Sequence, residues 1–61
     1  MKIDPEVARI IAQAENVFVD AESGQYNHTE GATHGWEPVP MYWVAIAEQA
    51  IADAAEYNKV N

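Results

Sequence analysis

Residues 41–57, MYWVAIAEQAIADAAEY, are the stretch of the chain that most clearly indicates its secondary structure. Apolar residues recur there at the spacing of one side of an α-helix. The stripe consists of Trp43, Ile46, Ala47, Ala50, Ile51, Ala54 and Tyr57. Alanine is abundant and loses no side-chain entropy in a helix. With Pro38 and Pro40 just ahead, where a missing N–H does least harm, the sequence predicts a helix over residues 40–58 with Trp43 in the core.

A second helix is indicated near the N-terminus. Asp4, Pro5 and Glu6 make a typical helix start, with a capping acid, a proline at the first position and an acid at the positive end of the dipole. The apolar residues that follow in steps of four and three are Ile3, Val7, Ile10, Ala14, Val17 and Ala21. Gly24 suits the position just after a helix. We therefore predict a helix over residues 5–23.

The end of this helix has an alternative. Residues 17–19, Val-Phe-Val, favour a β-strand, and a turn at residues 22–24 could open a hairpin that ends near Tyr26. The unbroken apolar stripe favours the helix.

Residues 24–38, GQYNHTEGATHGWEP, cannot form a long helix because they contain three glycines and a proline. Connections of this length are usually functional or disordered. The aromatic residues Tyr26 and Trp36 are rare in disordered linkers, so we expect an ordered loop that folds back over the helices. These two aromatics either cap the open end of the core or anchor a partner.

Together these segments predict one all-α domain over residues 1–61, an antiparallel two-helix hairpin with a long ordered loop that contains the glycines and histidines. A chain of 61 residues buries only about 60% of its unfolded surface, and no cysteine is present to form a disulfide. Alanines outside the main stripe of residues 40–58 offer a second packing surface. We therefore expect a homodimer with a four-helix arrangement.

The net charge of −7 comes from ten carboxylates against Lys2, Arg9 and Lys59. It argues against direct binding to nucleic acid or to an anionic membrane, and it favours a protein partner with a basic surface. The sequence has no apolar run of membrane-spanning length and no apolar segment of a signal peptide at its start, so we expect a cytoplasmic protein. In size and charge it resembles the small accessory proteins that phages and mobile elements encode to block host enzymes.

Two groups of side chains have residue types that can carry chemistry. His28, Glu30 and His34 are suitable metal ligands, but a glycine-rich loop does not preset their geometry. Asp53 and Glu56 lie one helical turn apart, a spacing that can hold Mg²⁺ only with a second acidic pair on a neighbouring helix. Neither group is decisive, and the only serine, Ser23, lies at a predicted helix end. We therefore predict no cofactor and no enzymatic activity.

The leading hypothesis is a non-catalytic protein-binding module that inhibits or modulates a host protein. Aromatic side chains dominate many interfaces, and carboxylates beside them steer a basic partner. The candidate partner-binding residues are Tyr26, Glu30, Trp36, Glu37, Asp53 and Glu56. One alternative is a metal-binding regulatory or catalytic protein that uses the loop histidines. Another is a nucleic-acid mimic that presents an acidic surface.

Overall fold

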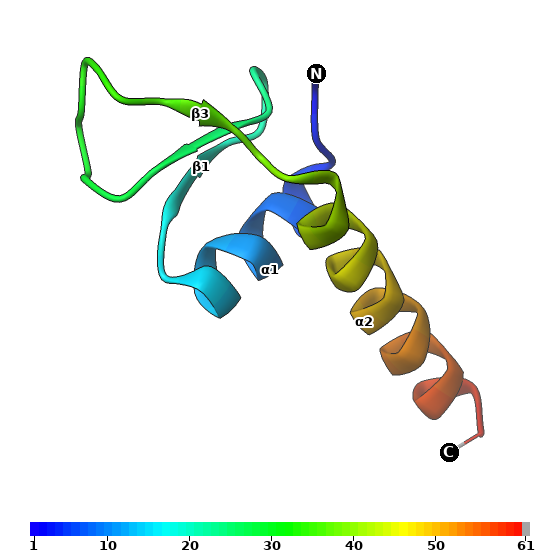
Figure 1. Ribbon diagram of the computed structural model, residues 1–61. Helices are drawn as coiled ribbons and strands as arrows, with labels where there is room; N and C mark the ends of the chain where they lie inside the picture. The colour runs from blue at the N-terminus through cyan, green and yellow to red at the C-terminus, as the bar shows by residue number, and fades with distance from the viewer. Residues whose placement is uncertain (61) are drawn as a thin grey trace.

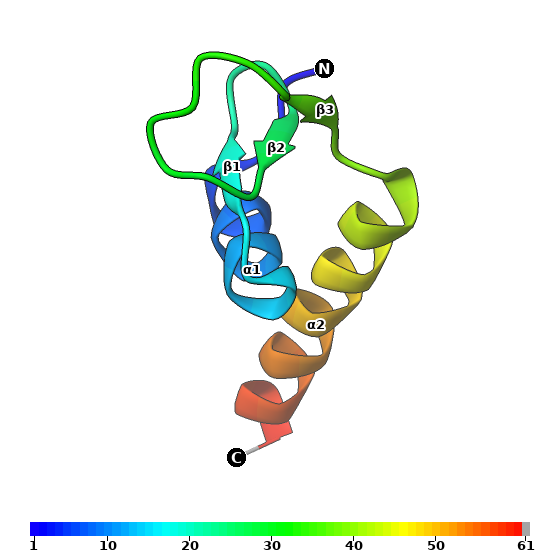
Figure 2. The same ribbon diagram turned by 60° about the vertical axis from the view of Figure 1, so that its left-hand side comes forward.

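The computed structural model describes residues 1–60, which form two helices and a three-stranded antiparallel sheet. The order is α1 (Pro5–Glu15), β1 (Phe18–Asp20), β2 (Gln25–Asn27), β3 (Glu37–Pro38) and α2 (Met41–Val60). The sheet lies over α1 and beside the start of α2, and the second half of α2 extends away from the rest of the chain (Figures 1 and 2). The last residue of the predicted domain, residue 61, lies outside the described residues.

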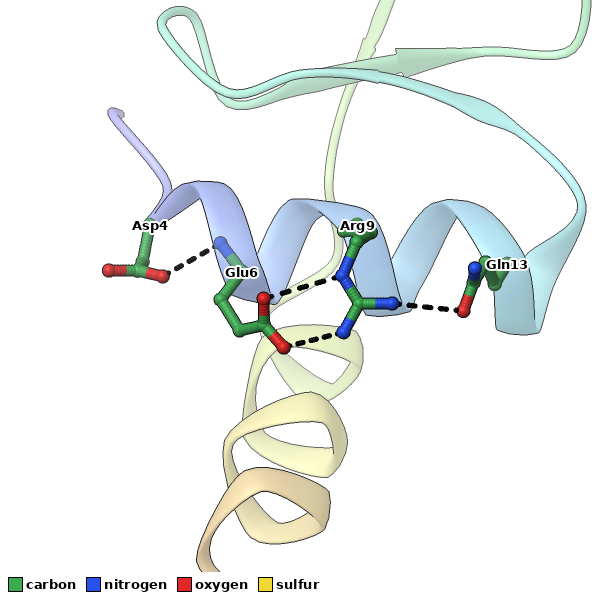
Figure 3. Close-up of polar contacts among 4 residues, drawn as sticks. All are labelled: Asp4, Glu6, Arg9 and Gln13. Atoms are coloured by element: carbon green, nitrogen blue, oxygen red, sulfur yellow. Dashed lines mark hydrogen bonds and ion pairs between the residues drawn. The ribbon is translucent and has the colours of Figure 1, made fainter. Parts of the chain in front are cut away.

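The start of α1 follows the sequence signals. The Oδ1 atom of Asp4 accepts a hydrogen bond from the backbone N–H of Glu6 at 2.9 Å, which satisfies one of the free donors of the first turn. Pro5 occupies the first helical position. On the exposed side of the helix, the guanidinium of Arg9 donates to the carboxylate of Glu6 and to the amide oxygen of Gln13 (Figure 3).

The all-α prediction is wrong, because the chain leaves the helix at Asn16 instead of residue 23. Asn16 has a φ of 56°, in the left-handed region, and its N–H donates to the carbonyl of Ala12. Asparagine tolerates this conformation better than most residues. The β-branched and aromatic residues 17–19 then run into β1, so the hairpin alternative is the one that the structure contains.

Strands β1 and β2 are joined by a tight turn over residues 21–24. Val19 pairs with Tyr26, and the backbone N–H of Gly24 donates to the carbonyl of Asp20 at 2.8 Å. The side chain of Asp20 accepts from the N–H of Glu22 at 3.1 Å, a local bond typical of acidic residues in turns. Gly24 is buried and has a φ of +71°, which favours glycine.

The rest of the predicted hairpin is also corrected. Residues 24–38, expected to be a loop, contain β2 and β3, with Tyr26 paired to Glu37 across the two strands. The chain therefore has no two-helix hairpin, and a four-helix arrangement of two such hairpins is wrong. The second helix begins one residue later than predicted and runs to Val60.

The core lies between the sheet, α1 and the first half of α2. The buried apolar residues are Ile3, Val7, Ala8, Ile11, Val17, Val39 and Ala47. At 1% exposure, Ala47 is the most buried of these, and its small side chain lets α1 approach α2 closely. Trp43 is half-buried and packs against this core.

Neither helix within residues 1–60 combines the length and the apolar character needed to cross a membrane.

Candidate functional site

Three aromatic rings and a carboxylate meet where the sheet adjoins the start of α2. The ring centroids of Tyr26 and Trp43 are 4.9 Å apart at an interplanar angle of 56°. Those of Tyr42 and Trp43 are 6.3 Å apart at 74°. The hydroxyl of Tyr26 donates to Oε2 of Glu37 at 3.3 Å. We refer to Tyr26, Glu37, Tyr42 and Trp43 as the aromatic–acidic cluster.

The strand register places Tyr26 and Glu37 side by side. They are direct partners across β2 and β3, so their side chains leave the sheet on the same face. The half-buried position of Tyr26 raises the pKa of its hydroxyl, because the phenolate would lose hydration; the charge of Glu37 and the hydrogen bond to it act in the same direction. Tyr26 therefore stays a neutral hydrogen-bond donor at neutral pH.

The short link between β3 and α2 brings the other two rings to this place. Val39 is buried, and its backbone N–H donates to the carbonyl of Gly24 at 2.9 Å. Pro40 then leads into the helix, where the N–H of Trp43 donates to its carbonyl at 3.0 Å. Because Tyr42 and Trp43 are about 100° apart around the helix, Trp43 faces the core while Tyr42 is 65% exposed.

The loop between β2 and β3 is held by its own side chains. Asn27, which is 7% exposed, donates from Nδ2 to the carbonyl of His34 and accepts at Oδ1 from the N–H of Thr29, both at 2.9 Å. The indole N–H of Trp36 donates to the carbonyl of Ala32, also at 2.9 Å. Trp36 is half-buried, and this hydrogen bond ties its ring to the loop backbone.

The residues of the metal alternative do not assemble. Within the side chains that the structure describes, no three histidine, aspartate or glutamate groups lie close enough together to hold a metal ion. His28 instead packs edge-on against Tyr26, with ring centroids 5.7 Å apart. His34 contributes its backbone carbonyl to the bond with Asn27, and Glu30 is exposed on the loop.

The structure brings together only part of the predicted partner-binding set. Tyr26 and Glu37 are in contact. Asp53 and Glu56 are exposed on the half of α2 that extends away from the sheet (Figure 1), and Asp53 accepts a hydrogen bond from Gln49 at 2.9 Å. Asp53 and Glu56 therefore belong to a different surface from the aromatic–acidic cluster.

Tyr42 is not among the residues predicted for the site. A signal was present, because two adjacent aromatics at a helix start point about 100° apart and cannot both face the core. Trp43 is predicted only as a core residue. Its ring also contacts those of Tyr26 and Tyr42.

Comparison of the chain with models of protein families, with curated proteins and with solved structures gave no match.

Proposed function

We propose that this protein is a non-catalytic binding module for a protein partner with a basic surface, and that the aromatic–acidic cluster receives an arginine or lysine side chain of that partner. The observation that carries the proposal is the packing of the Tyr26 and Tyr42 rings on Trp43, with the carboxylate of Glu37 hydrogen-bonded to Tyr26. An aromatic face attracts a cation within about 6 Å of its centroid, and arginine is the commoner guest. A carboxylate beside the rings adds a charge-assisted hydrogen bond.

The exposure of the cluster supports this role. Tyr42 is 65% exposed and Glu37 is exposed, whereas Tyr26 and Trp43 are half-buried and fixed by the core. Two rings are thus held rigidly while one ring and the carboxylate meet solvent. Such preorganisation reduces the entropy that binding would otherwise cost.

The lysine and arginine side chains of the described residues lie away from the aromatic–acidic cluster. Lys2 lies 3.7 Å from the carboxylate of Glu22, and Arg9 is paired with Glu6. Lys59 lies in the last turn of α2, at the end remote from the sheet (Figure 1). The negative charge of the cluster is therefore left for a cation from outside, and the net charge of −7 steers basic partners toward the protein.

A pair of charge-matched variants tests the proposal. The probe is a short peptide that bears two arginines, compared with the same peptide bearing glutamines, and binding is followed by calorimetry. Glu37→Gln should weaken arginine-peptide binding by about tenfold, since a charged hydrogen bond is worth roughly 1.5–3 kcal/mol. Glu56→Gln removes the same charge from the remote half of α2 and should change the affinity by less than about twofold.

Tyr42→Leu separates cation recognition from general attraction, because leucine keeps the apolar surface and removes the π-face. We expect it to weaken the arginine peptide several-fold and to leave the glutamine peptide unchanged. Equal losses in the Glu37 and Glu56 variants would show that only net charge attracts the peptide and would contradict the proposal. The same variants test whether a protein captured from a cell lysate binds through the cluster, because its retention should then depend on Glu37 and not on Glu56.

A further inference from the structure

A groove runs along the side of α2 that faces the start of α1, and we call it the α1–α2 groove. It consists of two adjoining hollows that share Asp4, Val7 and Glu48. The first hollow extends to Ile51 and has a volume of about 360 Å³, and the second extends to Met41 and has a volume of about 260 Å³. The first volume is within the range of ligand sites in proteins, about 300–1,000 Å³. The groove therefore has room for side chains of a partner.

The floor of the groove is apolar. Val7 is buried, and Val44 and Ile51 are half-buried and pack against the core, so their positions are fixed. At one end Met41 is 62% exposed, which is high for a large apolar side chain. Met41, Val44 and Ile51 follow one another at helical spacing along α2. At 1.5 Å per residue they form a row of apolar contacts about 15 Å long.

Two carboxylates without a cation belong to the opposite walls of the groove. Asp4 lies at the start of α1, where one of its oxygens accepts the N–H of Glu6. Glu48 lies on α2 and makes no hydrogen bond or ion pair within the residues that the structure describes. Like charges that line the same hollow repel each other, and a cation placed between them relieves this repulsion.

The cations nearest to the groove are already paired. Arg9 is bound to the carboxylate of Glu6 (Figure 3). Lys2, which lines one end of the groove, lies 3.7 Å from the carboxylate of Glu22. The charge of Asp4 and Glu48 is therefore available to a cation from outside the described chain.

We propose that the α1–α2 groove docks a basic amphipathic helix of a protein partner. Apolar side chains of that helix lie on Val7, Val44 and Ile51, and lysine or arginine side chains beside them reach Asp4 and Glu48. A helix whose apolar side enters an apolar groove is a recurring mode of recognition. A small molecule is normally buried over most of its surface, whereas this groove is open along its length and suits an elongated segment. About three turns of helix match the row of apolar contacts.

The α1–α2 groove is separate from the aromatic–acidic cluster, so this proposal goes beyond the proposed function and does not rest on it. Met41 in the groove and Trp43 in the cluster lie about 200° apart around α2. Trp43 lines a different hollow together with Ile10 and Ile46, and its volume of about 30 Å³ is too small for a large side chain.

Designed peptides test the proposal, with binding followed by calorimetry. The probe is a peptide of about twelve residues with leucine at helical spacing on one side and lysine on the other. A scrambled peptide keeps the composition and the charge but has no apolar side, and a third peptide has glutamate in place of lysine. We expect the probe to bind about tenfold more tightly than either control. Equal affinity for the scrambled peptide would show that only net charge attracts it and would overturn the proposal.

Paired variants locate the binding site. Met41→Gln removes apolar surface from the groove and should weaken binding of the probe by about fivefold. Ile46→Gln is the matched control, because Ile46 is also 62% exposed but lies about 140° away around the helix. Glu48→Gln should weaken binding by about fivefold through loss of a charged contact, whereas Glu56→Gln, about two turns further along α2, should change it by less than about twofold. All four side chains are exposed, so the fold should be retained.

The methyl resonances of the groove report the contact directly. Those of Val7, Val44 and Ile51 should shift when the probe is added, and those of Ile46 should shift less. Larger shifts at Ile46, or equal losses of affinity in the Met41 and Ile46 variants, would place the peptide elsewhere and overturn the proposal.

Failure of this proposal can be told apart from failure of the proposed function. Glu48→Gln should weaken the helical probe and leave binding of the arginine peptide within about twofold, whereas Glu37→Gln should have the reverse effects. Loss of both peptides in both variants would show that one acidic surface attracts any cation, and it would contradict a separate docking groove.

Discussion

At the scale of single residues, a close approach of two backbone segments depends on a glycine. A Cβ atom added at Gly24 would lie 1.8 Å from the carbonyl oxygen of Met1, and the residue has a φ of +71°. The segment that would have to move carries Ile3, which is 3% exposed and whose N–H donates to the carbonyl of Ala21 at 2.7 Å. Gly24 therefore connects the turn of the hairpin to the start of the core.

Gly24→Ala should lower the free energy of unfolding by about 3 kcal/mol or more, as the sum of backbone strain and steric overlap. Gly31→Ala is the matched control, because Gly31 has a φ of +72° and nothing within 4 Å of an added Cβ. Its cost should be the strain alone, about 1–2 kcal/mol. Urea unfolding followed by circular dichroism measures both, and equal losses would show that the contact with Met1 is not maintained.

The Tyr26–Glu37 pair predicts a pH dependence. Burial and, after it, Glu37 raise the pKa of Tyr26 in the folded state. The folded chain therefore holds this proton more tightly than the unfolded chain, in which tyrosine has a pKa of about 10. The stabilisation is fully present below that pH and is lost as the pH rises through the higher, folded-state pKa.

Melting temperatures measured at increasing alkaline pH should therefore fall less steeply in Tyr26→Phe than in the wild type. Glu37→Gln should bring the titration of Tyr26, followed by tyrosinate absorbance, to lower pH, since it removes the neighbouring negative charge. A titration that does not move would mean that the carboxylate is not beside the phenol in solution.

At the scale of elements, Asn16 decides where α1 ends. Asn16→Ala favours a continued helix by intrinsic propensity but is strained at a φ of 56°. We expect it to lower the free energy of unfolding by about 1 kcal/mol, whereas Asn16→Gly should be neutral or stabilising at this C-terminal position. Chemical denaturation of the two variants gives the comparison. A more stable alanine variant would instead support a helix that continues toward residue 23.

Much of the helical structure could be predicted from the sequence. The cap at Asp4, the proline at position 5 and the alanine-rich stripe are local signals, and α1 and α2 begin where these signals place them or one residue away. The end of α1 could not be decided in this way. Val17 is buried as the stripe requires, but it reaches the core after a left-handed residue and not as part of a helix.

The candidate site was only partly predictable, because it depends on strand register. Tyr26 and Glu37 are both predicted for a partner-binding surface in the same segment, but their contact follows from the pairing of β2 with β3. That pairing spans 11 positions of sequence and leaves no periodic signal. Trp36 had the residue type of a binding anchor, and its bond to Ala32 shows that it serves the loop conformation.

At the scale of the whole molecule, acidic side chains lie at both ends of the fold. The aromatic–acidic cluster adjoins the sheet, whereas Asp53 and Glu56 lie on the half of α2 that extends away from it (Figure 1). The proposed basic partner would contact the cluster, and the net charge of −7 would attract it over a longer range.

Salt should therefore weaken the proposed binding at the aromatic–acidic cluster. Screening shortens the range of electrostatic forces from about 10 Å at 0.1 M ionic strength to about 3 Å at 1 M. Binding of the arginine peptide should weaken over this range, because the attraction between unlike charges is lost. Calorimetry with the peptide over this salt series measures the trend. A peptide affinity that is indifferent to salt would show that the charge of Glu37 does not contribute to recognition.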